Sequence, residues 1–218
     1  MSKKLELDLR LYVITDRLLS CGRSHREVVA CAIAGGATCI QLREKDLSTR
    51  ELYVIAEDLR RLTREKGVTF IINDRLDVAL AVGADGVHLG PDDLPLAAAR
   101  RLMPPEMILG ASAGNLKEAL EAQRMGATYL GVGSVFATAT KADAGEPIGP
   151  EGLSYICHRV SIPVVGIGGI NASNARSVME AGAAGVAVIS SVVAASDIAS
   201  AAKELFEILE QFGATSKS

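Results

Sequence analysis

Five charged side chains follow short apolar runs of the sequence: Arg43, Lys45, Asp74, Asp93 and Lys141. Carboxylates attract Mg²⁺, which keeps several waters and binds substrate phosphates, while arginine and lysine neutralise the remaining phosphate oxygens. The set therefore predicts a diphosphate pocket in which Asp74 and Asp93 hold Mg²⁺. The alternative is that Arg43, Lys45, Asp74 and Asp93 form rings of ion pairs that stabilise one edge of the fold.

The segments that carry these charges repeat one another. Four stretches begin with Gly-Ala and continue into a short apolar run, starting at Gly36, Gly83, Gly126 and Gly182. Their spacing leaves room for a strand-helix-strand-helix unit, and such repeats are diagnostic of architecture. Four further strands are expected between them, at Leu11–Ile14, Thr69–Ile72, Met107–Leu109 and Ile162–Ile167.

Strands and helical segments alternate throughout, which favours parallel pairing through right-handed crossovers. Eight such strands can close, so we expect an α/β fold with a single (βα)₈ TIM barrel over residues 1–218. That length is short of the roughly 250 residues typical of this barrel and leaves little room for a second domain. Barrels of this type carry their chemistry at the C-terminal ends of the strands.

Polar residues stand at those strand ends, including Gln41, Asn73, His88 and Ser112. Residues 136–149 lack apolar periodicity and are expected to form a flexible loop, since loops of this length in compact domains are usually functional or disordered. A disordered tail is expected at about 213–218.

A second phosphate site is indicated by two segments, Gly168-Gly169-Ile170 and Val188-Ile189-Ser190-Ser191. In many barrels the loops after strands 7 and 8 bind phosphate through backbone N–H groups. The alternative is that these glycines only make tight strand-to-helix connections.

Composition favours a small-molecule ligand. The net charge is −3 with both signs interspersed, which indicates neither a nucleic-acid partner nor a membrane-binding basic face. No run reaches about 18 apolar residues, and the N-terminal segment lacks the apolar core of a signal peptide. We therefore expect a cytoplasmic protein, and the sequence carries no signal for its oligomeric state.

The cysteines and histidines are scattered. Cys21, Cys31, Cys39 and Cys157 show no CxxC spacing, so they are expected to be reduced and mostly packed. His25 and His158 are expected at the surface. No serine or cysteine is expected to be paired with a histidine as an activated nucleophile.

Helix ends are also predicted. Ser24, Ser48, Asn115 and either Ser173 or Asn174 stand where N-caps are expected. Left-handed glycines are expected at the helix ends, at Gly35, Gly83, Gly126 and Gly182.

Five segments together resemble the thiamin phosphate synthase family in order and spacing: Gln41-Leu42-Arg43-Glu44-Lys45, Ile72-Asn73-Asp74-Arg75, His88-Leu89-Gly90-Pro91-Asp92-Asp93, Thr138-Ala139-Thr140-Lys141 and Gly166-Ile167-Gly168-Gly169-Ile170. The resemblance covers nearly the whole chain. It implies a transferase that joins 4-amino-5-hydroxymethyl-2-methylpyrimidine diphosphate to 4-methyl-5-(2-phosphoethyl)thiazole, giving thiamin phosphate and diphosphate with Mg²⁺ assistance.

The resemblance also implies roles for individual residues. Asp74 and Asp93 would hold the metal, and Gln41 and Ser112 would address the pyrimidine, with His88 nearby in a role left open. The diphosphate would be held, and its departure assisted, by Arg43, Lys45, Asn73 and Lys141. The thiazole phosphate would be received by Thr138, Thr140, Gly169, Ile189 and Ser190.

Two other functions stay open at this point. A thiazole tautomerase of the same fold isomerises the thiazole without handling a diphosphate, so it has no use for paired metal carboxylates and three phosphate cations. A phosphate-ligand sensor would bind both substrates without releasing diphosphate. Fold alone does not decide among these functions.

Overall fold

The computed structural model describes residues 7–138 and 146–213, and these form a closed barrel of parallel strands in the order β1 to β8. The strands are β1 (Leu11–Ile14), β2 (Cys39–Leu42), β3 (Thr69–Asn73), β4 (Gly86–Leu89), β5 (Ile108–Ala113), β6 (Tyr129–Val132), β7 (Val164–Ile167) and β8 (Gly185–Val188). The predicted (βα)₈ TIM barrel is confirmed.

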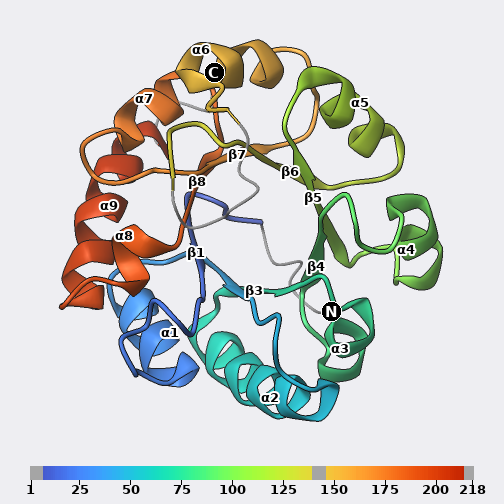
Figure 1. Cartoon of the computed structure of the whole chain (residues 1–218), viewed down its shortest axis with the longest axis vertical. Helices are drawn as coiled ribbons and strands as arrows, with labels where there is room; N and C mark the ends of the chain where they lie inside the picture. Colours follow the sequence, from blue (N-terminus) through green and yellow to red (C-terminus); the bar gives the residue numbers. More distant parts are fainter. Residues whose placement is uncertain (1–6, 139–145, 214–218) are drawn as a thin grey trace.

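Helices surround the barrel as a ring (Figure 1). They are α1 (His25–Ala34), α2 (Thr49–Lys66), α3 (Leu76–Val82), α4 (Leu96–Leu102), α5 (Leu116–Arg124), α6 (Gly149–Cys157), α7 (Ala175–Glu180), α8 (Ser190–Val193) and α9 (Ile198–Gly213). In the described part of the chain, none of these helices has the length and apolar character needed to cross a membrane.

Side chains alternate along each strand, which gives the molecule two apolar layers. In β1, Leu11 and Val13 pack with the large core between strands and helices, whereas Tyr12 and Ile14 belong to a smaller cluster with Ile71. This smaller cluster fills the inside of the barrel, beneath the C-terminal ends of the strands.

Three strands differ from their predicted bounds, and the first of them, β3, extends by one residue to Asn73. β5 extends to Ala113, beyond the predicted Leu109, because Ala113 pairs in register with Val132 of β6. Ser112 therefore lies within the strand and not after it. β7 begins at Val164 and not at Ile162, since Pro163 has no N–H to contribute to the ladder.

The predicted helix starts are confirmed. Ser24 and Ser48 form capping boxes with the residues three positions later, and the Asn115 side chain accepts a hydrogen bond from the Glu118 N–H. Asn174, rather than Ser173, is the residue before α7.

One predicted left-handed glycine is wrong. Gly35 has φ −85°, and the left-handed residue at the end of α1 is Gly36, with φ 102°. A Cβ at Gly36 would overlap the Phe206 ring of α9. Gly83, Gly126 and Gly182 do adopt positive φ.

Two surface expectations are also wrong. All four cysteines are free thiols, but Cys21 and Cys31 are exposed and only Cys39 is fully buried. His158 is exposed as predicted, whereas the His25 side chain is only 12% exposed because it packs against Glu44.

Candidate active site

A cavity of about 570 Å³ opens at the C-terminal ends of the strands. The barrel brings the predicted site residues of the described segments together on its wall, from every strand except β1. These residues are Gln41, Arg43, Lys45, Asn73, Asp74, His88, Asp93, Ser112, Thr138, Gly169, Ile189 and Ser190.

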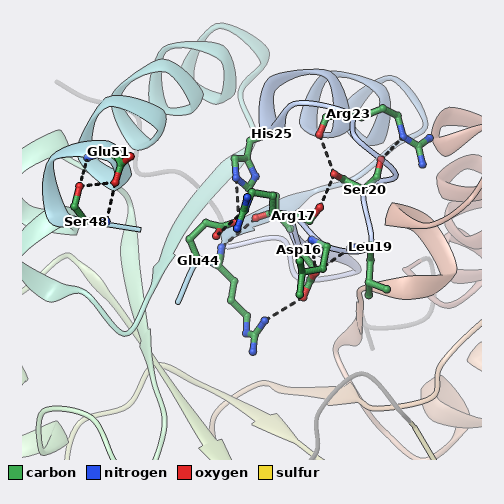
Figure 2. A network of polar contacts seen from close by, with 12 residues as sticks. Asp16, Arg17, Leu19, Ser20, Arg23, His25, Glu44, Ser48 and Glu51 are labelled. Carbon is green, nitrogen blue, oxygen red and sulfur yellow. Dashed lines mark hydrogen bonds and ion pairs between the residues drawn. The ribbon is translucent and has the colours of Figure 1, made fainter. Parts of the chain in front are cut away.

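The end of β2 places three of these side chains on one side. Gln41, Arg43 and Lys45 alternate with Leu42 and Glu44, so the first three line the cavity while Leu42 joins the outer core. Glu44 turns toward α1, where its Oε1 lies 3.0 Å from His25 Nε2 (Figure 2). The alternation explains why cation and amide side chains occur at every second residue.

Arg43 is held in place by the loop that follows β1. Its backbone N–H donates to Thr15 Oγ1 at 3.1 Å, and its Nη1 donates to Asp16 Oδ2 at 3.2 Å. The other oxygen of Asp16 accepts from the N–H groups of Leu18 and Leu19, at 3.0 and 3.1 Å. Asp16 and Leu19 are labelled in Figure 2. Asp16 therefore fixes both the loop and the guanidinium, a role that the sequence analysis missed.

Asp74 and Asp93 stand at the ends of neighbouring strands. Asp74 adopts φ 61°, a left-handed conformation that aspartate tolerates better than most residues, and its N–H donates to the His88 carbonyl at 2.9 Å. Asp93 Oδ2 accepts from the Gly90 N–H at 2.7 Å, which closes the loop after β4. Within the described residues neither carboxylate forms an ion pair, so the ion-pair alternative does not describe them.

The pKa of Asp74 is raised to about 6, mainly by burial. A hydrogen bond to Asp93 and the negative charge of Asp93 raise it further. Two carboxyl groups so placed resist carrying two negative charges unless a cation lies between or beside them. The pair fits Mg²⁺, because both groups offer oxygen and no third histidine, thiolate or carboxylate joins them in the described segments. Mg²⁺ typically takes one or two carboxylates and fills its remaining positions with waters and phosphate oxygens.

The opposite wall of the cavity is formed by the loops after β7 and β8. Gly168 and Gly169 have φ 98° and 65°, and a Cβ at Gly169 would overlap the Ala137 carbonyl and the Phe136 side chain. Ile189 and Ser190 follow β8 on the same cavity. Glycine is thus required here by the backbone conformation and by the close approach of Phe136 and Ala137.

Polar side chains inside the barrel form a continuous network, which the sequence analysis missed. Gln41 Nε2 donates to the Tyr12 hydroxyl at 2.6 Å, and that hydroxyl lies 2.8 Å from the Tyr129 hydroxyl. The Tyr129 hydroxyl lies 2.9 Å from His88 Nδ1, and His88 Nε2 lies 3.0 Å from Ser112 Oγ. We call these five residues the Tyr12–Tyr129 network.

The Ser112–His88 contact was not expected from the sequence, and a contact of this kind does not by itself make Ser112 an activated nucleophile. The two residues come from β4 and β5 and are separated by 24 positions, so the pairing arises only from strand register. The available signal for such a polar interior was one tyrosine in each of two otherwise apolar strands, Tyr12 in β1 and Tyr129 at the start of β6.

The described residues at the two ends of the predicted loop are hydrogen-bonded to the barrel. The Phe136 N–H donates to the Gly168 carbonyl at 3.0 Å, and the Gly149 N–H donates to the Val135 carbonyl at 3.0 Å. Thr138 lines the cavity, whereas Thr140 and Lys141 lie outside the described residues. The predicted tail beyond α9 also lies outside them, and its flexibility stays a prediction.

A family model described as thiamine monophosphate synthase matches residues 11–192, from β1 to α8. The chain belongs to this family. It is 60% identical over 199 residues to the thiamine-phosphate synthase of Chloroflexus aurantiacus, covering 91% of this chain and 92% of the relative. It is 57% identical to the enzyme of the same name from Moorella thermoacetica, covering 91% and 95% of the two chains.

A solved structure within the same family, thiamine phosphate pyrophosphorylase from Pyrococcus furiosus, superposes with a TM-score of 0.88 at 52% identity, covering 94% of this chain and 97% of that one. The thiamin phosphate synthase resemblance found in the sequence is therefore confirmed over the whole barrel. The roles of individual residues rest on the geometry above and are proposed below.

Proposed function

We propose that this transferase joins 4-amino-5-hydroxymethyl-2-methylpyrimidine diphosphate to 4-methyl-5-(2-phosphoethyl)thiazole, giving thiamin phosphate and diphosphate. The observation that carries the proposal is one cavity with a carboxylate pair and two cations on one wall and a glycine-rich anion cradle on the other. A reaction between two phosphorylated substrates requires both walls. Family membership supports the same activity.

The first wall binds the diphosphate. Arg43 and Lys45 neutralise its oxygens and Asn73 donates an amide hydrogen, while Asp74 and Asp93 would hold Mg²⁺. When bound, Mg²⁺ supplies positive charge to the departing diphosphate. Lys141 and Thr140 keep the diphosphate and thiazole-phosphate roles implied by the resemblance.

The second wall binds the other substrate. Backbone N–H groups at Gly169 and around Ile189 and Ser190, with the Thr138 side chain, receive the thiazole phosphate. Both substrates are then held in one cavity, so the two reacting atoms are already positioned and do not have to meet by diffusion. The Tyr12–Tyr129 network lies at the pyrimidine side.

The chemistry proceeds by departure before attack. The bond between the pyrimidine methylene carbon and the diphosphate oxygen breaks, and its electron pair leaves with the diphosphate. The thiazole nitrogen then donates its lone pair to the resulting cation, forming the new carbon–nitrogen bond. Arg43 and Lys45 assist by stabilising the charge that develops on the leaving group, which is commonly the largest catalytic contribution.

This order of steps is tested by measuring how the reaction rate responds to an electron-withdrawing group on the pyrimidine. A trifluoromethyl group on the pyrimidine withdraws electrons from the developing cation, so the rate should fall by several orders of magnitude, each ~1.4 kcal/mol costing tenfold. A direct displacement would respond weakly. A nearly unchanged rate, or a pyrimidine adduct on the protein by mass spectrometry, would exclude departure before attack.

Diphosphate release separates this function from its alternatives. We expect the purified protein to release diphosphate only when both substrates and Mg²⁺ are present, and to stop when EDTA is added. A thiazole tautomerase would isomerise the thiazole alone, and a sensor would bind both compounds without release; either result would contradict the proposal. Small molecules are its partners, and a cytoplasmic location stays a prediction.

A further inference from the structure

The Tyr12–Tyr129 network has a direction. Gln41 Nε2 can only donate, so the Tyr12 oxygen accepts at this contact and its own hydrogen is available for the Tyr129 oxygen 2.8 Å away. When the Tyr129 oxygen accepts from Tyr12, the one hydrogen of Tyr129 is available for His88 Nδ1, which lies 2.9 Å away. Each residue therefore passes its hydrogen one way, from β2 toward β4.

The tautomer of His88 follows from this direction. Because Nδ1 accepts from Tyr129, the neutral imidazole carries its hydrogen on Nε2, which donates to Ser112 Oγ at 3.0 Å. In a hydrolase triad the third group is a carboxylate that accepts from Nδ1 and leaves Nε2 free to take the serine proton. Here a phenol replaces the carboxylate, so His88 cannot act as the base for Ser112.

Two groups remain for a ligand. The Ser112 oxygen already accepts from His88, so the serine hydrogen is free to donate into the cavity. Gln41 gives its amide nitrogen to Tyr12, and its Oε1 has no hydrogen-bond partner among the described residues. One end of the network thus offers a donor and the other an acceptor.

We propose that the Gln41 amide, which donates through Nε2 to Tyr12, sets the direction of the Tyr12–Tyr129 network; this leaves Ser112 as a donor and Gln41 Oε1 as an acceptor, and thereby selects a 4-aminopyrimidine over its 4-oxo analogue. An unprotonated ring nitrogen accepts from Ser112, and the exocyclic amino group donates to Gln41. A 4-oxo group would instead bring a second acceptor against Gln41 Oε1. This inference rests on the proposed function, because it says how Ser112 and Gln41 recognise the pyrimidine at that site.

The surroundings hold the network in this state. Tyr12 and Tyr129 are almost completely buried, and burial keeps the pKa of both phenols well above the usual 10, so each retains its hydrogen. Gly110 of β5 makes room, since a Cβ there would overlap both the Tyr129 hydroxyl and His88 Nδ1.

Reversal of the Gln41 amide would reverse every bond. Its oxygen would accept from Tyr12, and His88 would carry its hydrogen on Nδ1 and accept from Ser112. The histidine tautomer therefore reports the direction of the whole network, without any need for substrate or turnover.

The first test is nitrogen NMR of the full-length free protein at neutral pH. The chain has three histidines, and the His88 signals are assigned by their loss in His88→Asn. We expect an unprotonated Nδ1 and a protonated Nε2. Tyr129→Phe should abolish this preference, whereas Ser112→Ala should keep it, because the direction is set from the Gln41 end. A protonated Nδ1 in the wild type would overturn the proposal.

The second test measures binding of 4-amino and 4-oxo pyrimidine diphosphates by calorimetry, without the thiazole. We expect the wild type to prefer the amino compound by about 10²-fold or more, because the oxo compound leaves buried polar groups unpaired. Tyr12→Phe frees the Gln41 amide and should reduce this ratio about tenfold. Tyr155→Phe, at a tyrosine 53% exposed, is the matched control and should leave it unchanged.

These readouts separate the two proposals. Amino preference that depends on Tyr12, in a protein that forms no thiamin phosphate, would uphold the network and reject the function. An equal ratio in the wild type and Tyr12→Phe would reject the network, whatever the turnover. Should Tyr12→Phe fail to fold, Ser112→Ala replaces it: the variant should bind the amino compound about tenfold more weakly.

Discussion

Asp16 is expected to set the affinity for the diphosphate through Arg43, although we do not place it against the substrate. The guanidinium and the carboxylate are 17% and 13% exposed and lie 3.2 Å apart, so the pair is little screened by water. In Asp16→Ala the arginine gains rotamer freedom that binding must remove, at about 0.5–1.5 kcal/mol per immobilised side chain. The KM for the pyrimidine diphosphate should therefore rise roughly two- to tenfold, with a smaller change in kcat.

A second variant separates positioning from loop stability. Asp16→Asn keeps the Oδ1 acceptor used by the N–H groups of Leu18 and Leu19, but it replaces Oδ2 with an amide donor facing Arg43. Both variants should raise KM, while only Asp16→Ala should also lower the melting temperature.

The assay is initial-rate kinetics with varied pyrimidine diphosphate at saturating thiazole phosphate. Asp58→Asn is the control, because it removes an exposed carboxylate paired with Arg26 at 2.8 Å on the outside of the barrel, and its KM should equal that of the wild type. An unchanged KM in both Asp16 variants would refute the positioning argument.

Three further outcomes are expected. Asp74→Asn or Asp93→Asn should cut turnover at least about 10²-fold with an unchanged circular dichroism spectrum, as should EDTA in the wild type. Burial lowers the pKa of His25 below its usual 6.5, although the negative charge of Glu44 acts in the opposite direction and raises it. Below pH 6.5 the unfolded chain therefore binds a proton at His25 that the folded protein excludes. Urea titrations should show unfolding free energy falling as pH drops through that window, but not in His25→Gln. Gly110→Ala should lower stability by about 1–3 kcal/mol in thermal unfolding, since its Cβ has no space.

The barrel could be predicted because its signals are local. Each Gly-Ala step and apolar run marks one strand, and alternation of strands with helices leaves few possible topologies. The positions of Arg43 and Asp74 at the mouth could be predicted for the same reason, since each directly follows its strand. Local signals failed at Gly35, where the close packing of α1 on α9 moved the left-handed turn to Gly36.

The interior of the site could not be predicted, because it depends on which distant residues meet. Tyr12 and Tyr129 are 117 positions apart and touch only once the barrel closes. The Ser112–His88 pair depends on β5 extending past Leu109, which the sequence did not indicate. His25 was expected at the surface because nothing local shows that Glu44 points away from the cavity.

The account's central claim is tested most directly by the mass of the product. Purified protein is mixed with both substrates and Mg²⁺, and the mixture is analysed by mass spectrometry alongside a diphosphate assay. We predict thiamin phosphate and diphosphate in a one-to-one ratio. Both substrates recovered unchanged, or an isomerised thiazole beside intact pyrimidine diphosphate, would contradict the claim.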